Sequence, residues 1–293
     1  MNGLLIVDKP AGWTSHDVVG KLRRVFGERR VGHSGTLDPM ATGVLPVFVG
    51  RATRAVPFCE NDRKEYIAAF RPGIVTDTQD ITGTILSRCE SLPERQEVLD
   101  ILPEFTGELI QIPPMYSAVK VQGKKLYELA RKGMEVERKP RKITIYSLTA
   151  EDWDGSDIML RVCCSKGTYI RTLCHDIGRR LGCGGCLAGL RRTAAGRFTL
   201  DDCVTMEQIL SAAEEGRARE LLRPVDSLFD CPVVTVTGSD RKRCLNGNPF
   251  SCEGLEDGFY RVYDEKGSFL LFGSCSSGVM STVKSFFETG EGS

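Results

Sequence analysis

The chain has 293 residues and carries 39 basic and 39 acidic side chains, so its formal net charge is zero. A hydrophobic content of 41% is enough to pack one large domain and a small second one, whereas no apolar run is long enough to span a bilayer. The first residues lack the basic start and long apolar stretch of a signal peptide, and we therefore expect a cytoplasmic protein.

The first third of the chain predicts short strands around one helix. "GLLIVDKP" is typical of a strand ended by proline, and Ser15 then predicts the N-cap of an amphipathic helix that ends at Gly27. After a glycine-rich loop, "GVLPVFVG" predicts a short buried strand. "KEYIAAF" and "TGTILSR" predict neighbouring strands joined by the polar segment "RPGIVTDTQDI".

The remainder predicts further helices and then a change of pattern. Residues 94–106 and 124–132 are expected to be helical, and "RKITIYSLTAEDW" and "DIMLRVCCS" to be strands around the turn Asp154-Gly155. Thr168 is expected to cap a helix that Gly182 ends, and "TMEQILSAAEE" predicts another helix. From about residue 231 short strands alternate with glycine turns. We therefore expect an α+β domain over residues 1–230, with a mixed, mainly antiparallel sheet and flanking helices, and a small β-rich domain over residues 231–293.

The twelve cysteines are expected to be reduced, and most of them to be small buried hydrophobes. Cys183 and Cys186 form a CxxC motif, with Cys174 and His175 upstream. A zinc site there is conceivable, but a lone CxxC without a second pair is weak support for one. We therefore expect no metal.

Three basic clusters interrupt the neutral average: residues 21–30, 138–142 and 190–197. Such clusters can bind RNA phosphates even on a protein without net charge. For any one cluster, a solvated helix face or loop is the simpler interpretation.

The stretch "GHSGTLDPMATGVLP" places a lone acid, Asp38, on a loop that glycines allow to fold tightly and Pro39 stiffens. The chain has no HExxH, P-loop lysine, GxSxG or dinucleotide motif. Composition alone favours a turn aspartate that bonds its own backbone. The alternative is an active-site carboxylate.

The residue sequence around this stretch, "GHSGTLDPMATGVLPVFVGRATR", closely resembles the catalytic motif of the TruB family of tRNA pseudouridine synthases. Other stretches resemble that family in the same order: "LLIVDKPAGWTS", "KEY", "IPPMYSAVKVQGKKLYELARKGMEVERKPRKITI", "SKGTYIRTLCHDIGRRLG" and "LRRTAAGRF". The resemblance covers roughly residues 3–230, and the C-terminal module is similar to the RNA-binding PUA-like end of these enzymes. Several motifs in order are far more specific than any one of them.

The resemblance implies isomerisation of uridine to pseudouridine at position 55 in the T-loop of tRNA, without a cofactor. It implies that Asp38 is the catalytic aspartate and that Arg171 pairs with it. The other implied site residues contact the flipped nucleotide or support the site: Tyr66, which stacks on the base and assists proton transfer at C5; Tyr169 and Leu190, which line the uracil pocket; His33, which enters the T-loop; and Lys9 with Pro10. Each also has a plain structural interpretation, as core, surface or strand-end residue.

Several alternatives stay open. Asp38 can attack C1′ as a nucleophile or remove the 2′ proton to give a glycal. A guide-RNA-dependent relative shares the aspartate motif, although the insertion around residues 120–145 looks like the stand-alone bacterial form. A tRNA-folding chaperone without turnover is another alternative for the function.

We expect a monomer that needs no protein partner. Family members often have an alanine-histidine pair where this chain has Gly185-Cys186.

Overall fold

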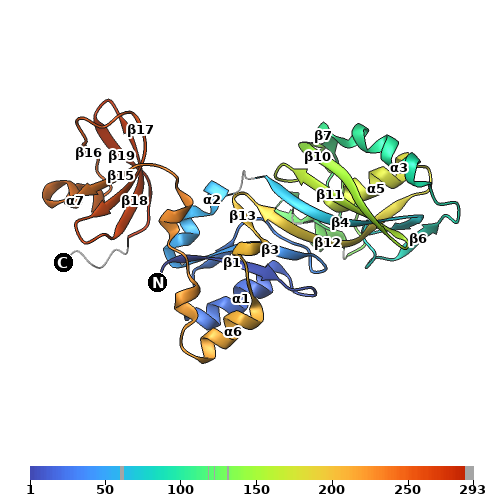
Figure 1. The fold of residues 1–293 in the computed structure, drawn as a ribbon, viewed down its shortest axis with the longest axis horizontal. Helices are drawn as coiled ribbons and strands as arrows, with labels where there is room; N and C mark the ends of the chain where they lie inside the picture. The colour runs from blue at the N-terminus through green and yellow to red at the C-terminus, as the bar shows by residue number, and fades with distance from the viewer. Residues whose placement is uncertain (60–62, 118, 122, 131, 288–293) are drawn as a thin grey trace.

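The computed structural model describes residues 1–59, 63–117, 119–121, 123–130 and 132–287. A long, twisted ten-stranded sheet runs through the larger part of the molecule, and a separate five-stranded sheet lies at one end (Figure 1). Helices flank the large sheet (Figure 1). The expected α+β class is confirmed.

The large sheet contains β1 (Gly3–Lys9), β2 (Val31–His33), β3 (Thr42–Val49), β4 (Lys64–Pro72), β7 (Gly107–Gln111), β10 (Arg141–Asp154), β11 (Asp157–Cys164), β12 (Gly185–Ala195), β13 (Phe198–Thr199) and β14 (Val204–Thr205). Its main path runs β14-β1-β3-β12-β4-β11-β10-β7, with β2 beside β3 and β13 beside β12. Only β1 with β14 and β3 with β12 run parallel among the pairs of this sheet that the described residues form. The sheet is therefore mixed and mainly antiparallel, as expected.

Helices and 3₁₀ turns connect the strands: α1 (Ser15–Phe26), η1 (Gly50–Ala55), α2 (Val56–Cys59), α3 (Arg95–Ile101), η2 (Leu102–Phe105), α5 (Ile170–Arg180), η3 (Leu200–Asp202), α6 (Met206–Glu214), η4 (Ala218–Leu221) and η5 (Val225–Leu228). The apolar faces of α1, α5 and α6 contribute to the main hydrophobic core. Over the described part of the chain, no helix has the length and apolar character needed to cross a membrane.

Two helix starts differ from the sequence-based expectations. Thr14, not Ser15, caps α1, because the Thr14 side chain accepts the Asp17 N–H while Asp17 accepts the Thr14 N–H. Tyr169, not Thr168, is the N-cap residue of α5, and the Thr168 hydroxyl donates to Ser165 instead. The predicted end of α1 at Gly27 is confirmed, with the glycine in the left-handed region.

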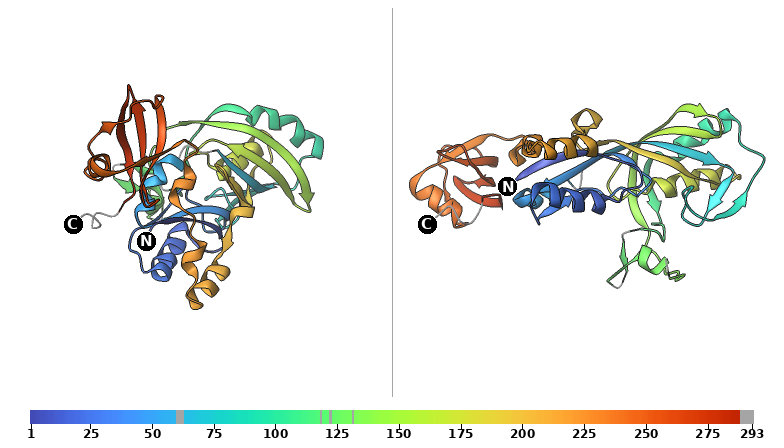
Figure 2. Two further views of the ribbon diagram at one scale, coloured as in Figure 1. Left: turned by 60° about the vertical axis from the view of Figure 1, so that its left-hand side comes forward. Right: turned by 90° about the horizontal axis from the view of Figure 1, so that it is seen from below.

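The two helices expected at 94–106 and 124–132 are shorter than predicted. The first is α3 followed by the 3₁₀ turn η2, in which Pro103 lacks the N–H that an α-helix needs. The second region holds β9 (Lys124–Lys125), which pairs with β8 (Lys120–Val121), and then α4 (Leu126–Ala130); residue 131 lies outside the described residues. This segment projects from the body of the molecule (Figure 2).

The expected pairing of "KEYIAAF" with "TGTILSR" is wrong. "KEYIAAF" forms β4, whose neighbours are β11 and β12. "TGTILSR" contains β6 (Ile85–Arg88), which pairs with β5 (Ile74–Thr76) in a ribbon of its own. Gly73, at a φ of +80°, turns the chain out of the large sheet before β5. β12 lies beside β4 instead. The sequence did not predict this strand, because its glycines and paired arginines are not typical of a strand pattern.

The C-terminal module contains β15 (Val233–Val236), α7 (Gly238–Leu245), β16 (Phe250–Ser251), β17 (Gly258–Asp264), β18 (Phe269–Ser276) and β19 (Val279–Ser285), in the sheet order β15-β17-β18-β19-β16. It has its own small core. Phe229, in the connecting segment, stacks on Phe272 with ring centres 4.3 Å apart and meets Phe58 of α2 edge-on at 5.3 Å. The β-rich end is confirmed, while the boundary between residues 230 and 231 stays a prediction.

One row of paired residues crosses four adjacent strands at the centre of the large sheet. Lys9 of β1 pairs with Gly43 of β3, Gly43 with Arg192 of β12, and Arg192 with Tyr66 of β4. Segments far apart in the sequence therefore meet beneath the loop that carries Asp38.

Candidate active site

Lys9 supports the loop that carries Asp38 through hydrogen bonds to backbone carbonyls. Its side chain is fully buried, and the ammonium group donates hydrogen bonds to three carbonyls: those of Pro10 at 2.8 Å, Trp13 at 2.6 Å and Pro39 at 3.3 Å. The residue that follows Asp38 is thereby tied to the end of β1. The structure places Lys9 at the site as an internal support.

Ser15 holds the same loop on the other side of Asp38. Its hydroxyl accepts the Leu37 N–H at 2.9 Å and donates to the Leu37 carbonyl at 3.2 Å, and both residues are buried. One side chain thus satisfies both backbone groups of the residue before Asp38. Sequence reasoning missed this role because a serine before an amphipathic helix predicts a cap.

Arg171 and Asp38 form an ion pair, as the resemblance implied. Arg171 Nε lies 2.9 Å from Asp38 Oδ2; the arginine side chain is 5% exposed, whereas that of Asp38 is 40% exposed. The remaining guanidinium nitrogens donate to the carbonyls of Thr78 at 3.1 Å and Tyr116 at 2.7 Å. The cation is therefore fixed by the protein, while the carboxylate keeps one side open.

Asp80 is a second acid at the site, and sequence reasoning missed it. Its side chain is buried, and Oδ2 lies 3.4 Å from Arg171 Nη1. Thr78 and the Thr82 N–H donate to Oδ1, each at 3.0 Å. Asp80 lies in the polar segment "TDTQD", where threonines on both sides of an aspartate indicate a side-chain-bonded turn but not a distant arginine.

The electrostatics leave Asp38 more basic than a free aspartate. Burial raises the pKa of the Asp38 carboxyl above its ordinary value, and the nearby charge of Asp80 acts in the same direction, whereas Arg171 and Lys9 oppose the rise. Burial also lowers the pKa of Lys9 to about 8. A carboxylate whose charged form is destabilised is a stronger base and nucleophile than the same group in water.

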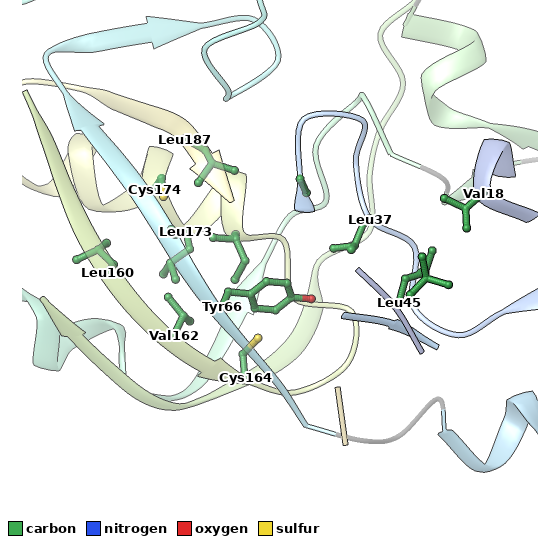
Figure 3. Packing of buried hydrophobic residues seen from close by; sticks show 14 of the residues in the cluster. Val18, Leu37, Leu45, Tyr66, Leu160, Val162, Cys164, Leu173, Cys174 and Leu187 are labelled. Carbon is green, nitrogen blue, oxygen red and sulfur yellow. The ribbon is translucent and has the colours of Figure 1, made fainter. Parts of the chain in front are cut away.

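Tyr66 lies beside the loop. It is buried on β4, and its phenol ring points from the strand toward Leu37 (Figure 3). Burial raises the pKa of the Tyr66 phenol, and the charge of Arg192 lowers it in part. Its hydroxyl is therefore protonated at neutral pH. The structure therefore places Tyr66 next to the loop that carries Asp38.

Tyr169 is held at the start of α5 by Gln111, which sequence reasoning also missed. The Tyr169 N–H donates to Gln111 Oε1 at 2.8 Å, and Gln111 Nε2 donates to the Tyr169 carbonyl at 3.0 Å. This two-way clamp fixes the residue that precedes Arg171 by two positions. Burial raises the pKa of the Tyr169 phenol, which is therefore neutral.

Leu190 and His33 complete the predicted set. Leu190, on β12 opposite Ala68, is half-buried and packs against the main core. His33 ends β2, with its ring centre 5.5 Å from that of His16 in an edge-on contact. Burial, followed by the charges of His16 and Arg192, lowers the pKa of His33 to about 4. The imidazole is therefore neutral at physiological pH.

Comparison with known proteins decides the family. The sequence profile described as "TruB family pseudouridylate synthase (N terminal domain)" matches residues 23–170, and that described as "tRNA pseudouridylate synthase B C-terminal domain" matches residues 171–230. The chain belongs to the TruB family of pseudouridine synthases. The TruB matches contain every predicted site residue except Lys9 and Pro10, which lie before them.

Curated TruB relatives are similar over most of their length. The chain is 41% identical to "tRNA pseudouridine synthase B" of Clostridium kluyveri, covering 98% of this chain and 100% of that one. It is 45% identical to the protein of the same name from Dechloromonas aromatica, covering 90% and 89%. Among solved structures, a chain of "a Cbf5-Nop10-Gar1 Complex" has a TM-score of 0.71 at 26% identity, covering 97% of this chain and 85% of that one.

The described part of the chain gives the cysteines no metal centre. Among the described residues, no group of three or more His, Cys, Asp or Glu side chains is placed to hold a metal ion. Burial raises the pKa of Cys186 to about 11, so its thiol is protonated at neutral pH. The departure from the TruB pattern at residue 185 has a packing reason, because a Cβ there would lie 2.4 Å from the Phe70 ring.

Proposed function

We propose that the chain isomerises uridine to pseudouridine at position 55 in the T-loop of tRNA, acting in the cytoplasm as a single protein without a guide RNA. The observation that carries the proposal is the 2.9 Å ion pair between Arg171 and a half-exposed Asp38, with Tyr66 beside it. The relatives named tRNA pseudouridine synthase B support tRNA as the substrate.

The reaction balances without an oxidant, a reductant or a cofactor. The N1–C1′ bond breaks and its electron pair goes to the base, the base turns, and a C5–C1′ bond forms. C5 then loses a proton and N1 gains one. Asp38 acts on the ribose, where its carboxylate attacks C1′ or removes the 2′ proton. Arg171 keeps the carboxylate in its charged form.

The neutral aromatic side chains fit a flipped nucleotide. Extrusion of the target uridine costs a few kcal/mol of stacking, which contacts with aromatic side chains offset. Tyr66 contributes the stacking surface, with Tyr169 and Leu190 around it. A neutral His33 can enter the T-loop without carrying charge among the bases. The basic residues of 21–30 and 138–142 would contact phosphates.

Incubating the purified chain alone with an unmodified tRNA transcript tests the proposal. Pseudouridine should form at position 55, and a transcript with cytidine at that position should give none. Absence of product at position 55 would refute the proposed activity, whereas a requirement for added guide RNA would favour the guide-dependent class. Binding and refolding of tRNA without any pseudouridine would favour a chaperone.

A substrate with deuterium at C2′ of uridine 55 separates the two chemical routes. If Asp38 removes the 2′ proton, single-turnover rates should show a primary isotope effect. If Asp38 attacks C1′, the rate should be nearly unchanged, because no bond to the 2′ hydrogen breaks.

A further inference from the structure

Arg192 lies under the Asp38 loop and is one of the most deeply buried side chains of the molecule, at 1% exposure. It belongs to the basic cluster 190–197, yet it does not face solvent. Its Nε donates to the Val44 carbonyl at 2.7 Å, and its Nη2 donates to the Gly35 carbonyl at 2.9 Å. One guanidinium therefore joins the two ends of the loop, before and after Asp38.

The glycines of the loop are fitted to Arg192. A Cβ at Gly35 would lie 3.1 Å from Arg192 Nη1, and a Cβ at Gly43 would lie 2.2 Å from the Arg192 carbonyl oxygen. Both glycines have positive φ, +72° and +100° respectively. At Gly43 the backbone can approach the arginine this closely only without a side chain, whereas at Gly35 the guanidinium would have to shift by a few tenths of an ångström. Both glycines therefore lie in close contact with Arg192.

The charge of Arg192 has no carboxylate against it. None of the ion pairs formed by the described residues includes this guanidinium, whereas the neighbouring Arg191 pairs with Asp8 at 2.8 Å. A buried cation compensated only by carbonyls and neutral groups costs stability. Arg192 is therefore poorly explained as a stabilising element alone, and its cross-strand neighbour on β4 must be considered.

That neighbour is Tyr66. Arg192 and Tyr66 are direct cross-strand partners on β12 and β4, so their side chains lie on the same face of the sheet. Side chains of such a directly opposite pair lie within reach of each other, and the charge of the guanidinium acts on the phenol. A guanidinium has donors only, so in such a contact the phenol oxygen must accept. The phenol's own hydrogen then points away from Arg192.

We propose that Arg192 is a positioning residue that acts through Tyr66, holding the phenol in place against the target base while it joins the two ends of the Asp38 loop. The inference rests on the proposed function, in which Tyr66 contacts the base and assists proton transfer at C5. Arg192 thereby couples the group that acts on the base to the loop that acts on the ribose.

A double-mutant cycle tests the proposal. Arg192→Lys keeps the cation and its ability to bond loop carbonyls, but an ammonium cannot replace the planar fork. In single-turnover assays with saturating tRNA, Arg192→Lys should slow isomerisation about 100-fold with little change in affinity. In a Tyr66→Phe background the same change should cost no more than about threefold. An equal loss in both backgrounds would overturn the proposal.

A titration of Tyr66 gives a second readout that needs no activity. Tyr66 is one of seven tyrosines, so its fluorine resonance in fluorotyrosine-labelled protein can be assigned by comparison with Tyr66→Phe. Because the charge of Arg192 lowers the pKa of this phenol, Arg192→Gln, which removes that charge, should raise it. An unchanged titration would contradict the link even if the wild type proved inactive on tRNA, which would refute the proposed function separately.

Arg71→Met is the matched control. Arg71 also lies on β4, but it pairs with Asp157 at the far end of the strand, at 2.6 Å. Its loss should weaken the sheet and leave turnover within about twofold of wild type. If Arg71→Met slows isomerisation as much as Arg192→Lys, the effect at Arg192 is general destabilisation and the proposal is wrong.

Discussion

Replacing Ser15 with alanine tests whether one buried hydroxyl holds the catalytic loop. The change removes both hydrogen bonds to Leu37, at 2.9 and 3.2 Å. It leaves a buried N–H and a buried carbonyl without partners, each at a cost of about 1–3 kcal/mol. We expect the free energy of unfolding to fall by about 2–6 kcal/mol.

The same change should also slow the reaction, because Leu37 directly precedes Asp38. A loop displacement on the order of 1 Å can reduce turnover about 100-fold, and we expect a loss between about 10-fold and 100-fold in single-turnover rate. Urea unfolding measures the first effect, and pseudouridine formation in a tRNA transcript measures the second.

Thr14→Ala is the control, since it removes the cap of the same helix without touching the loop. It should cost about 1 kcal/mol of stability and leave turnover unchanged. If Ser15→Ala retains the turnover of Thr14→Ala, the loop does not depend on this hydroxyl and the reasoning is refuted.

Three further predictions follow from the same structure. Burial raises the pKa of Asp38 in the folded state, so the folded state loses stability as pH rises through the window between the unfolded and folded pKa values of this carboxyl. Asp38→Asn should therefore raise the melting temperature at about pH 7, and its difference from wild type should shrink toward about pH 4. An unchanged or lower melting temperature of the variant at neutral pH would contradict this prediction. Because burial lowers the pKa of Lys9 to about 8, the reaction rate should fall as pH rises past that value, and Lys9→Met should lack this fall. If the fall persists in the variant, it arises from another group. Phe229→Ala should lower the free energy of unfolding by about 3–5 kcal/mol, because Phe229 joins the C-terminal module to α2. As a control, Phe259→Ala should cost less than about 1 kcal/mol, because Phe259 is exposed. Equal losses of the two variants in urea unfolding would show that Phe229 does not form the junction.

The sequence predicted the residues that carry family motifs, but not the residues that hold them in place. Asp38, Arg171 and Tyr66 each stand in a motif, and the structure brings them together. Asp80 meets Arg171 across 91 residues, and Gln111 meets Tyr169 across 58. Such partners depend on tertiary contacts, which local spacing does not contain.

The local sequence pattern also gave a wrong prediction where charged residues are buried. The basic cluster 190–197 predicts a charged surface, yet its residues 190–195 belong to β12 at the centre of the sheet. Arg191 pairs with Asp8, and Arg192 is enclosed by the loop. A count of charges along the chain cannot distinguish a phosphate contact from a buried clamp, because the difference lies in the strands packed on either side.

The most direct test of the central claim is a single-turnover comparison of wild type and Asp38→Asn on one tRNA transcript, with binding measured in parallel. If the Asp38 carboxylate acts on the ribose of uridine 55, the variant should form no pseudouridine while its tRNA affinity stays within about tenfold of wild type, since phosphate contacts supply most of the binding. Full activity of Asp38→Asn would remove Asp38 from the chemistry and contradict the proposed mechanism.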